Sequence, residues 1–595
     1  MEIKRLFDYL TLHTDKRPET EFVSGKEIKA NGTKEWRHYT FREVKDISDK
    51  ISQLLINLGL KKEDKIAIIS ANRPEWNFAD LGSQQIGNIN VPMYPTISEA
   101  DYEFIFKDAN VQYAFVGDES IYKKVEPLLG RVGSLKGIFT FDRIAGADYL
   151  PEVLDRIDHI DQDEIENRKR LVDADEVVTY IYTSGTTGNP KGVMLTHNNI
   201  VSNLTSVARM LPFKEGKSLS FLPLCHSFER TVFYAYLMMN IHIYYAENLE
   251  TIGDNLKEVQ PFCFSTVPRL LEKVYEKIIA KGHELNGIKK AIFFWSVRVG
   301  SQYELGVDKG WWYNLKLSIA RKLVFSKWLE ALGNHVEFIV TGAAAMQPRL
   351  ITIFCAAGIH IIEGYGLTET SPVITINRFP EQERCLGTVG LPISGVEVRL
   401  GEDGEIIARG PNIMKGYYNR PDLTAEVIDK DGWFYTGDIG VWVEHFGRKF
   451  LKITDRKKEL FKTAGGKYIA PQAVENKMKE SRFIEQIMVV GGDDKKYIAA
   501  LIVPSFVQLR AWAEENEIAL TTNEELVKNQ FVNELLNKEV TRLNHSFGKW
   551  EQIKKIKLLP DEWTIDSGFL TPTLKLKRRV LADVFKNDID ALFKE

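Results

Sequence analysis

A loop rich in Gly, Ser and Thr constrains this chain more than any other feature. It follows Val177–Tyr182, a β-branched and aromatic run that predicts a buried strand. Glycines allow close backbone approach, hydroxyls and bare N–H groups cradle phosphate oxygens, and a lysine adds a point charge. The loop therefore predicts a triphosphate site, with a Ser/Thr/Gly surface turn as the alternative. Its candidate residues are Thr183, Ser184, Gly185, Thr186, Thr187, Gly188 and Lys191.

The loop differs from the Walker pattern, which ends in Gly-Lys-Ser/Thr. Here Asn189 and Pro190 separate the last glycine of the loop from Lys191, and Gly192 follows that lysine. A different kind of nucleotide enzyme is therefore expected.

Composition places the chain among soluble globular proteins of more than one domain. It has 595 residues, of which 44% are hydrophobic and 27% charged, and a net charge of −4. That charge gives no global attraction to nucleic acid. Four scattered cysteines predict a reduced, cytoplasmic protein. The most apolar run, Thr231–Ala246, is interrupted by Asn240 and His242, so we expect a buried core element and not a membrane span.

Short apolar runs alternate with helical patterns through the first part of the chain, which predicts α/β layers with parallel sheets. Lys65–Ser70 is one expected strand, and Pro74 is well placed in the first turn of the next helix. The charged stretch 452–475 contains a Gly-Gly turn and lies about 140 residues from the end. We expect the chain to divide there into a large unit and a small one.

Two further stretches carry candidate binding groups. Small residues from Gly342 onward follow an expected strand, and Glu363–Thr370 places two glycines around an aromatic ring. Glu369 is a candidate Mg²⁺ ligand, because Mg²⁺ prefers one or two carboxylates together with phosphate oxygens and water. Asp438, beside a tight glycine turn, suits both hydroxyls of a ribose. An exposed Glu in a turn and an Asx turn are the respective alternatives.

Three features had competing interpretations. His226, after the strand-like run Phe221–Cys225, is either a satisfied core histidine or the lining of an acyl site. The segment Lys273–Glu330 is rich in Lys, Trp and Phe, which predicts amphipathic helices. They either pack on the large unit or form a wall around a long apolar tunnel, to which a membrane-facing patch could be added. A basic cluster that includes Lys575 and Lys577 lies near the C-terminus. Composition alone favours a solvated basic segment there.

The stretches occur in one order: the loop 183–191, Gly-Tyr-Gly-Leu-Thr-Glu-Thr at 364–370, Tyr-Thr-Gly-Asp at 435–438, Asp-Arg-Lys-Lys-Glu at 455–459, and Pro572-Thr573 before Lys577. In this order the chain resembles the adenylate-forming, AMP-binding superfamily along its whole length. The run 431–475 and Leu-Thr-Pro-Thr-Leu-Lys-Leu-Lys at 570–577 resemble its long-chain fatty acyl-CoA synthetase branch. Many relatives have Gly before the last lysine, where this chain has Leu576.

The resemblance implies a fold and a set of site residues. The fold is α/β: a large multi-layer N-terminal domain (1–454) for ATP and the acyl group, a hinge (455–460), and a small mobile α+β C-terminal domain (461–595). Lys577 would be the catalytic lysine, with Thr183 and Glu369 at Mg²⁺ and His226 in the acyl site. The residues implied around the adenine, α-phosphate and ribose of ATP are Gly342, Glu363, Gly364, Tyr365, Gly366, Thr368, Asp438 and Arg456.

The resemblance also implies a two-step reaction. A long-chain fatty acid and ATP give acyl-AMP and pyrophosphate, and CoA then takes the acyl group and releases AMP. The C-terminal domain would rotate between the steps about Asp455 and Lys458, and a loop with Ala464, Gly465 and Gly466 would face CoA. An acyl carrier protein as acceptor, a medium-chain or aryl-CoA ligase, and a non-catalytic binding protein are the alternatives. Transient peripheral contact with the inner face of the membrane stays open.

Overall fold

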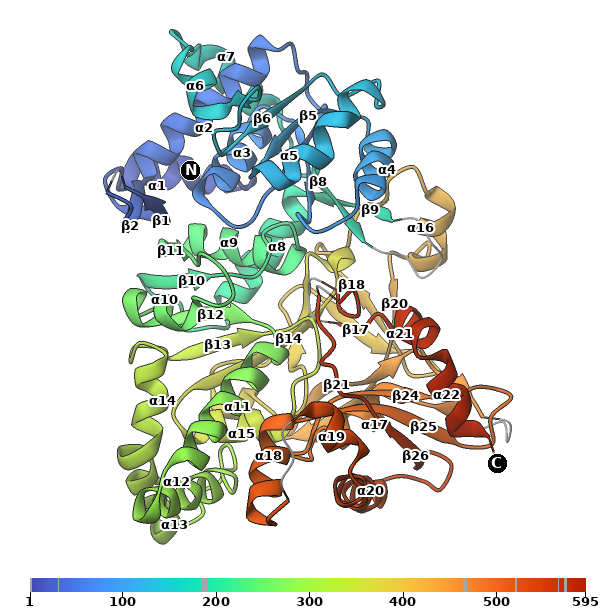
Figure 1. The fold of residues 1–595 in the computed structure, drawn as a ribbon. Helices are drawn as coiled ribbons and strands as arrows, with labels where there is room; N and C mark the ends of the chain where they lie inside the picture. The colour runs from blue at the N-terminus through green and yellow to red at the C-terminus, as the bar shows by residue number, and fades with distance from the viewer. Residues whose placement is uncertain are drawn as a thin grey trace.

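The computed structural model describes residues 3–29, 31–183, 190–457, 459–463, 468–518, 522–565, 567–571 and 575–594. Figure 1 shows the first part of the chain at the top, the middle at the lower left and the C-terminal part at the lower right. Within the described residues, no helix is long and apolar enough to cross a membrane.

An eight-stranded sheet with the order β19-β9-β8-β4-β3-β5-β6-β7 carries the phosphate-loop region. The strands from β8 to β7 in this order pair in parallel, whereas β9 is antiparallel to both β8 and β19. Its strands are β3 (Lys65–Ile69), β4 (Ile89–Met93), β5 (Val111–Val116), β6 (Gly137–Thr140), β7 (Asp148–Tyr149), β8 (Val177–Thr183), β9 (Lys191–Thr196) and β19 (Gly416–Tyr417).

Helices of the N-terminal part pack against this sheet. Pro74 opens α3 at its first turn, as expected, and the first helices are α1 (Asp8–Lys16), α2 (Phe41–Asn57), α3 (Pro74–Gln84), α4 (Glu99–Ala109), α5 (Glu119–Val125), α6 (Leu150–Asp155) and α7 (Gln162–Leu171). Thr40 begins α2 with a capping box, because its hydroxyl accepts from the Glu43 N–H at 3.2 Å and Glu43 accepts from the Thr40 N–H at 2.8 Å.

A nine-stranded sheet with the order β16-β15-β14-β13-β12-β10-β11-β1-β2 forms the second layer. It comprises β1 (Glu21–Ile28), β2 (Lys34–Thr40), β10 (Gly216–Ser220), β11 (Ile241–Tyr245), β12 (Cys263–Thr266), β13 (Phe338–Thr341), β14 (His360–Gly366), β15 (Val373–Ile376) and β16 (Leu391–Pro392). Its helices are α8 (His197–Ala208), α9 (Ser227–Met239), α10 (Ile252–Val259), α11 (Pro268–Glu284), α12 (Gly287–Gly300), α13 (Trp311–Ala320), α14 (Ser326–Ala331) and α15 (Pro348–Ala356).

Two sequence expectations in this layer meet different outcomes. The apolar run Thr231–Ala246 is a core element, since it forms most of α9, a left-handed turn at Asn240 and then β11. The strand expected over Phe221–Cys225 is wrong, because β10 already ends at Ser220 and His226 is the N-cap of α9. Pro223 within that run cannot donate a ladder hydrogen bond, which disfavours a strand there.

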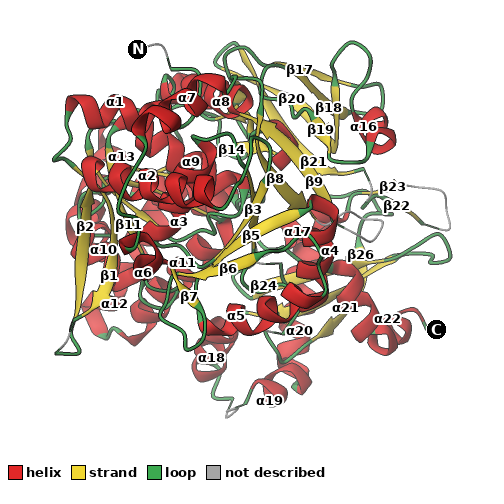
Figure 2. Ribbon diagram, turned by 90° about the horizontal axis from the view of Figure 1, so that it is seen from above, coloured by secondary structure: helices red, strands yellow, loops and turns green. Residues whose placement is uncertain are grey.

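A four-stranded antiparallel sheet links the large and small parts of the chain. It consists of β17 (Glu397–Leu400), β18 (Glu405–Arg409), β20 (Phe434–His445) and β21 (Arg448–Arg456), and α16 (Pro421–Val427) lies before β20. In Figure 2 these strands lie at the upper right, between the helical layers and the C-terminal elements.

The C-terminal part is α+β, as expected. A three-stranded sheet of β24 (Ile484–Val490), β25 (Ile498–Pro504) and β26 (Ile553–Leu558) accompanies a short pair, β22 (Phe461–Lys462) and β23 (Tyr468–Ile469). Its helices are α17 (Pro471–Met478), α18 (Phe506–Glu515), α19 (Asn523–Lys528), α20 (Gln530–Asn544), α21 (Arg578–Val584) and α22 (Lys586–Phe593).

Buried apolar side chains form separate clusters in the two parts of the chain. The three clusters of the large part draw on residues up to Ile453, and the two clusters of the C-terminal part draw on residues from Phe461 onward. The segment between them, residues 454–460, belongs to neither core.

Candidate active site

The phosphate-loop region lies at the ends of β8 and β9. Thr183 and Lys191 pair across these strands at the two sides of the loop. Ser184, Gly185, Thr186, Thr187 and Gly188 lie outside the described residues. The Lys191 ammonium lies 4.9 Å from the centre of the Tyr417 ring, on the strand β19 that pairs with β9. The structure thus brings Thr183 and Lys191 together at one end of the paired strands β8 and β9.

Glu369 is connected to this end of the strands by a hydrogen bond with Tyr417. Its carboxylate accepts a hydrogen bond from the Tyr417 hydroxyl at 2.9 Å, and its backbone carbonyl accepts from the Met414 N–H at 2.9 Å. Asn199, near the start of α8, donates to the carbonyls of Pro411 and Ile413 at 2.7 and 2.9 Å and so anchors the same segment.

These groups fit a Mg²⁺ ion. Glu369 is half-buried, and its carboxylate forms no ion pair among the described residues, although Lys191 is nearby. A partly dehydrated carboxylate near a hydroxyl such as that of Thr183 is the oxygen donor set that Mg²⁺ uses with phosphate and water.

Close backbone approach requires the glycine at position 366. A Cβ on Gly366 would lie 1.6 Å from the Pro372 carbonyl oxygen, so no other residue fits. A Cβ on Gly342 would lie 3.5 Å from the Gly364 carbonyl oxygen, which shows that these two segments run close together. Thr341 and Glu363 are paired across β13 and β14.

Glu363 is neutral in this environment. It is buried, one of its carboxyl oxygens accepts a hydrogen bond from the Met346 N–H at 3.3 Å, and burial raises the pKa of its carboxyl to about 8. A protonated Glu363 can donate as well as accept a hydrogen bond. Such a group suits the ring nitrogens and exocyclic amine of a base.

Asp438 is held between a tyrosine and an arginine. The Tyr365 hydroxyl donates to one carboxylate oxygen at 2.7 Å, and Arg456 Nε donates to the other at 3.1 Å. Register places Asp438 opposite Arg456 across β20 and β21. Burial together with the Asp438 charge raises the pKa of Tyr365 well above its ordinary value, so its hydroxyl stays a donor. Asp438 is therefore a hydrogen-bond acceptor in a strand, and the Asx-turn alternative is wrong.

Lys575 faces this group from the C-terminal part. Leu570 and Leu576 form an antiparallel bridge, and the Thr571 N–H donates to the Lys575 carbonyl at 2.8 Å, so these contacts hold the Lys575 backbone beside Thr571. Its pKa is lowered to about 8 by burial and by the Arg456 charge, against the opposing charges of Asp438, Glu459 and Glu369. Lys575 is exposed to solvent, as Lys577 is, and it differs from Lys577 in having these charged neighbours.

His226 belongs to the same group of residues. Its Nδ1 accepts from the Phe228 N–H at 3.2 Å, and the neighbouring Ser227 hydroxyl lies 3.2 Å from that of Thr368. Burial, together with the positive charge of Lys575, lowers the pKa of His226 to about 4, so the imidazole is neutral near pH 7.

Lys577 is not the lysine whose side chain interacts with Asp438 and Arg456. It is the exposed N-cap residue of α21, and its backbone N–H donates to the Phe569 carbonyl at 2.9 Å. The lysine that the structure brings to Asp438, Arg456 and Glu369 is Lys575, two residues earlier. The catalytic role of Lys577 stays a prediction, and Lys575 is the lysine for which the structure shows charged neighbours among the nucleotide-binding groups.

The segment between the two cores is anchored on both sides. Lys457 pairs with Asp403 and Glu405, at 2.7 Å each, whereas Glu459 pairs with Arg578 at 2.9 Å. Asp455 accepts from the backbone N–H of Gln472 at 3.2 Å, and burial raises the pKa of its carboxyl to about 7. Lys458, Ala464, Gly465 and Gly466 lie outside the described residues.

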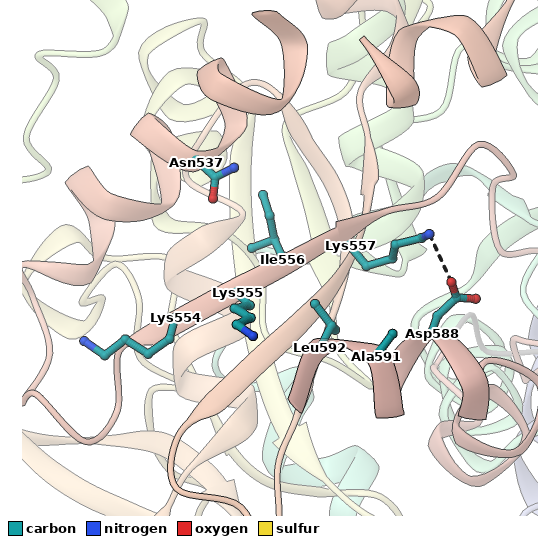
Figure 3. A pocket seen from close by; sticks show the side chains of 8 residues that line it. All are labelled: Asn537, Lys554, Lys555, Ile556, Lys557, Asp588, Ala591 and Leu592. Carbon is teal, nitrogen blue, oxygen red and sulfur yellow. Dashed lines mark ion pairs between the residues drawn. The ribbon is translucent and has the colours of Figure 1, made fainter. Parts of the chain in front are cut away.

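A surface pocket of about 310 Å³ lies elsewhere, between β26 and α22 (Figure 3). Lys554, Lys555 and Lys557 lie along its strand, and Lys557 pairs with Asp588 at 3.0 Å. None of the expected site residues lines it, so this pocket is separate from the candidate active site.

Proteins similar to this chain show its family. The family model described as AMP-binding enzyme matches residues 11–418. The long-chain-fatty-acid–CoA ligase FadD15 of Mycobacterium bovis is 33% identical over 575 residues, which cover 94% of this chain and 92% of that protein. Long-chain-fatty-acid–CoA ligase 1 of Homo sapiens is 33% identical over 594 residues, covering 94% and 82%.

Solved structures show the same fold at low identity. The adenylation domain of a carboxylate reductase from Mycobacterium chelonae has a TM-score of 0.74 and 20% identity, with 99% of this chain and 91% of that chain covered. A Mycobacterium tuberculosis fatty acyl CoA synthetase has a TM-score of 0.61 and 19% identity, with 98% and 99% covered. The expected fold class is thereby confirmed.

The chain belongs to the AMP-binding enzymes and, among them, to the family of the long-chain fatty acid–CoA ligases that it matches over nearly its full length.

Proposed function

We propose that this chain is an AMP-forming long-chain fatty acid–CoA ligase. The observation that carries the proposal is the convergence of Lys575, Asp438 and Arg456 near Glu369, at the junction of the two parts of the chain. The named activity of its full-length relatives supplies the substrate class.

In the first step a fatty carboxylate oxygen attacks the α-phosphorus of ATP, and pyrophosphate leaves with the electrons of the broken P–O bond. Both reactants are anionic, so cations must offset the charge that gathers in the transition state. Lys575 is our candidate for the cation between carboxylate and α-phosphate, in place of Lys577. Its support is the electrostatic contact with Asp438, Arg456 and Glu369.

The other residues bind and orient the nucleotide. The Asp438 carboxylate would accept from the ribose hydroxyls, with Arg456 and Tyr365 fixing its orientation. The neutral carboxyl of Glu363 and the backbone of Gly342 and Gly364 would face the adenine. Thr183 and Glu369 would hold Mg²⁺, which neutralises phosphate charge when bound.

In the second step the CoA sulfur attacks the acyl carbonyl carbon, and AMP leaves. We propose that the C-terminal part turns about residues 455–460 between the steps, so that Lys575 withdraws and the 463–467 loop approaches. The support is that these residues lie between two separate cores and that Lys457 and Glu459 are anchored to opposite sides. His226, neutral and close to Thr368 through Ser227, would line the acyl site.

We propose a cytoplasmic enzyme that contacts the inner face of the membrane transiently, since long-chain fatty acids partition into bilayers.

The test is ATP–pyrophosphate exchange with fatty acids of increasing length, followed by CoA addition. We expect exchange to be greatest with long acyl chains and a thioester to appear with CoA. Exchange without thioester would instead indicate an acyl carrier protein as acceptor, and no exchange with any fatty acid would overturn the proposed substrate class.

A further inference from the structure

The helix α13 and the segment that continues it expose large apolar side chains. The exposed fractions are 73% for Trp311, 58% for Trp312, 44% for Leu315, 41% for Ile319 and 52% for Leu323. Four of these residues follow a four-residue spacing, which keeps them on one side of a helix, and the first and last are about 18 Å apart along its axis. We call these five residues the α13 face.

The opposite side of the same helix already packs against the protein. Leu317, Ala320, Val324 and Phe325 are buried in the cluster that also contains Phe354 of α15. The helix is therefore apolar on both sides, although only one side has protein to cover it. A helix of this kind is normally buried all round, and an exposed apolar face of this size marks an interaction surface.

The region around the α13 face is strongly basic. Residues 287–327 contain eight Lys and Arg against two acidic residues, in a chain whose net charge is −4. Lys309 and Lys327 pair with Glu304 and Glu330. Lys289, Lys290, Lys316 and Lys322 form no ion pair within the described part of the chain.

The location of this region leaves it accessible to a large partner. Figure 1 shows α12, α13 and α14 at the lower left extremity of the molecule, at the end opposite to α6 and α7. A flat surface can therefore reach the α13 face without displacing another element.

We propose that the α13 face docks on an anionic lipid bilayer. Tryptophan, Leu and Ile would enter the boundary between headgroups and acyl chains, and the surrounding lysines would meet lipid phosphates. A second copy of this chain is a poorer occupant, because two such faces would bring the same positive excess together. The proposal rests on the proposed function in one respect, since a bilayer is where a long-chain fatty acid is found.

The experiment measures vesicle co-sedimentation of the full chain without ATP or CoA, so that its outcome does not depend on ligase activity. The vesicles are phosphatidylglycerol mixed with phosphatidylcholine, and phosphatidylcholine alone. We expect binding to the anionic vesicles only, and binding that weakens as salt rises.

Three variants separate the contributions. Leu315→Glu with Leu323→Glu should abolish binding, and Lys316→Glu with Lys322→Glu should weaken it roughly tenfold, as the loss of charges near an anionic surface predicts. Ile28→Glu with Val584→Glu is the matched control, because both residues are exposed and apolar but lie outside the α13 face. Circular dichroism and activity with detergent-dispersed fatty acid verify folding.

Two results would overturn the proposal. One is equal vesicle binding by the wild type and the Leu315/Leu323 variant. The other is a wild type that binds no anionic vesicles, in particular if it sediments as a dimer that the same variant dissociates, because the face would then be covered by a second copy.

Discussion

Arg269 on α11 binds Glu562 of the C-terminal part at 2.9 Å, and this contact joins the two parts of the chain. The same guanidinium also binds Glu485, and Lys273 binds Glu562 at 2.9 Å. Arg269 is almost buried. These contacts exist in the arrangement in which Lys575 faces Asp438, so they stabilise that arrangement.

Removing the Arg269 side chain should therefore affect the two half-reactions differently. We expect Arg269→Ala to lower the adenylation rate about tenfold, because loss of one partner in such a network costs on the order of 1–3 kcal/mol. Thioester formation from supplied acyl-AMP should not fall. Single-turnover assays of each step measure the difference.

Arg409→Ala is the control, because Arg409 pairs with Glu397 inside a single sheet. Arg269→Lys should recover part of the adenylation rate. An equal loss of both half-reactions in Arg269→Ala would contradict the role of this contact in domain arrangement.

Substitutions of Lys575 and Lys577 should have very different effects on adenylation. Lys575→Ala should lower adenylation by about 10²- to 10³-fold, the usual effect of removing one group that stabilises transition-state charge. Lys577→Ala should keep near wild-type adenylation, because Lys577 lies at the start of α21 and its side chain contacts none of the nucleotide-binding groups within the described residues. Pyrophosphate exchange measures both variants, and the reverse ranking would restore Lys577 as the catalytic lysine.

Adenylation should also depend on pH through Lys575. Its pKa of about 8 lies below the ordinary value for lysine, so the ammonium is present below pH 8 and is lost as pH rises through 8. The kcat/KM for ATP, which reports the free enzyme, should fall above pH 8.

Lys575→Arg should move this fall to higher pH in whatever activity remains, because a guanidinium stays charged. Glu363, whose carboxyl pKa is also about 8, is the other group that titrates there. If Glu363→Gln removes the fall and Lys575→Arg does not, the assignment to Lys575 is wrong.

Glu369→Gln should raise the Mg²⁺ concentration needed for half-maximal adenylation. Even residues that only orient a metal ligand typically cost about 10- to 100-fold in metal affinity, and we expect at least the lower value here. Tyr417→Phe, which removes only the hydrogen bond at 2.9 Å, should have a smaller effect. Titration of Mg²⁺ at fixed ATP measures both, with Glu397→Gln as a surface control.

Stability should depend on a buried ion pair between α3 and α9. Asp80 on α3 binds Arg230 on α9, and both residues are fully buried. Asp80→Asn should destabilise the protein by about 3–5 kcal/mol, because it leaves a charge buried without its partner. The midpoint of urea unfolding measures the change.

Lys123→Ala removes an exposed ion pair with Glu119 on α5 and should leave that midpoint unchanged. Replacing both buried partners, in Asp80→Leu with Arg230→Met, should recover part of the lost stability. A double variant that is less stable than Asp80→Asn would contradict this explanation.

Local patterns predicted most of the elements that carry the site. The predicted strand Lys65–Ser70 is one residue longer than β3, and Val177–Tyr182 is extended by one residue in β8. These predictions succeeded because short runs of β-branched and other apolar residues need no distant contact to be recognised. The prediction for Phe221–Cys225 failed because a proline inside an apolar run and a capping histidine after it decided the local structure.

The sequence by itself determined the family, the layered α/β class and the short stretches that hold polar groups, because those depend on residue types in a fixed order. Only the tertiary structure decided which groups meet. It set Asp438 between Tyr365 and Arg456, made Glu363 neutral by burial, and brought Lys575 and not Lys577 to them. The reason is physical: two lysines that are two residues apart are alike in a sequence, and the neighbours of each follow from how the C-terminal part packs against a distant sheet.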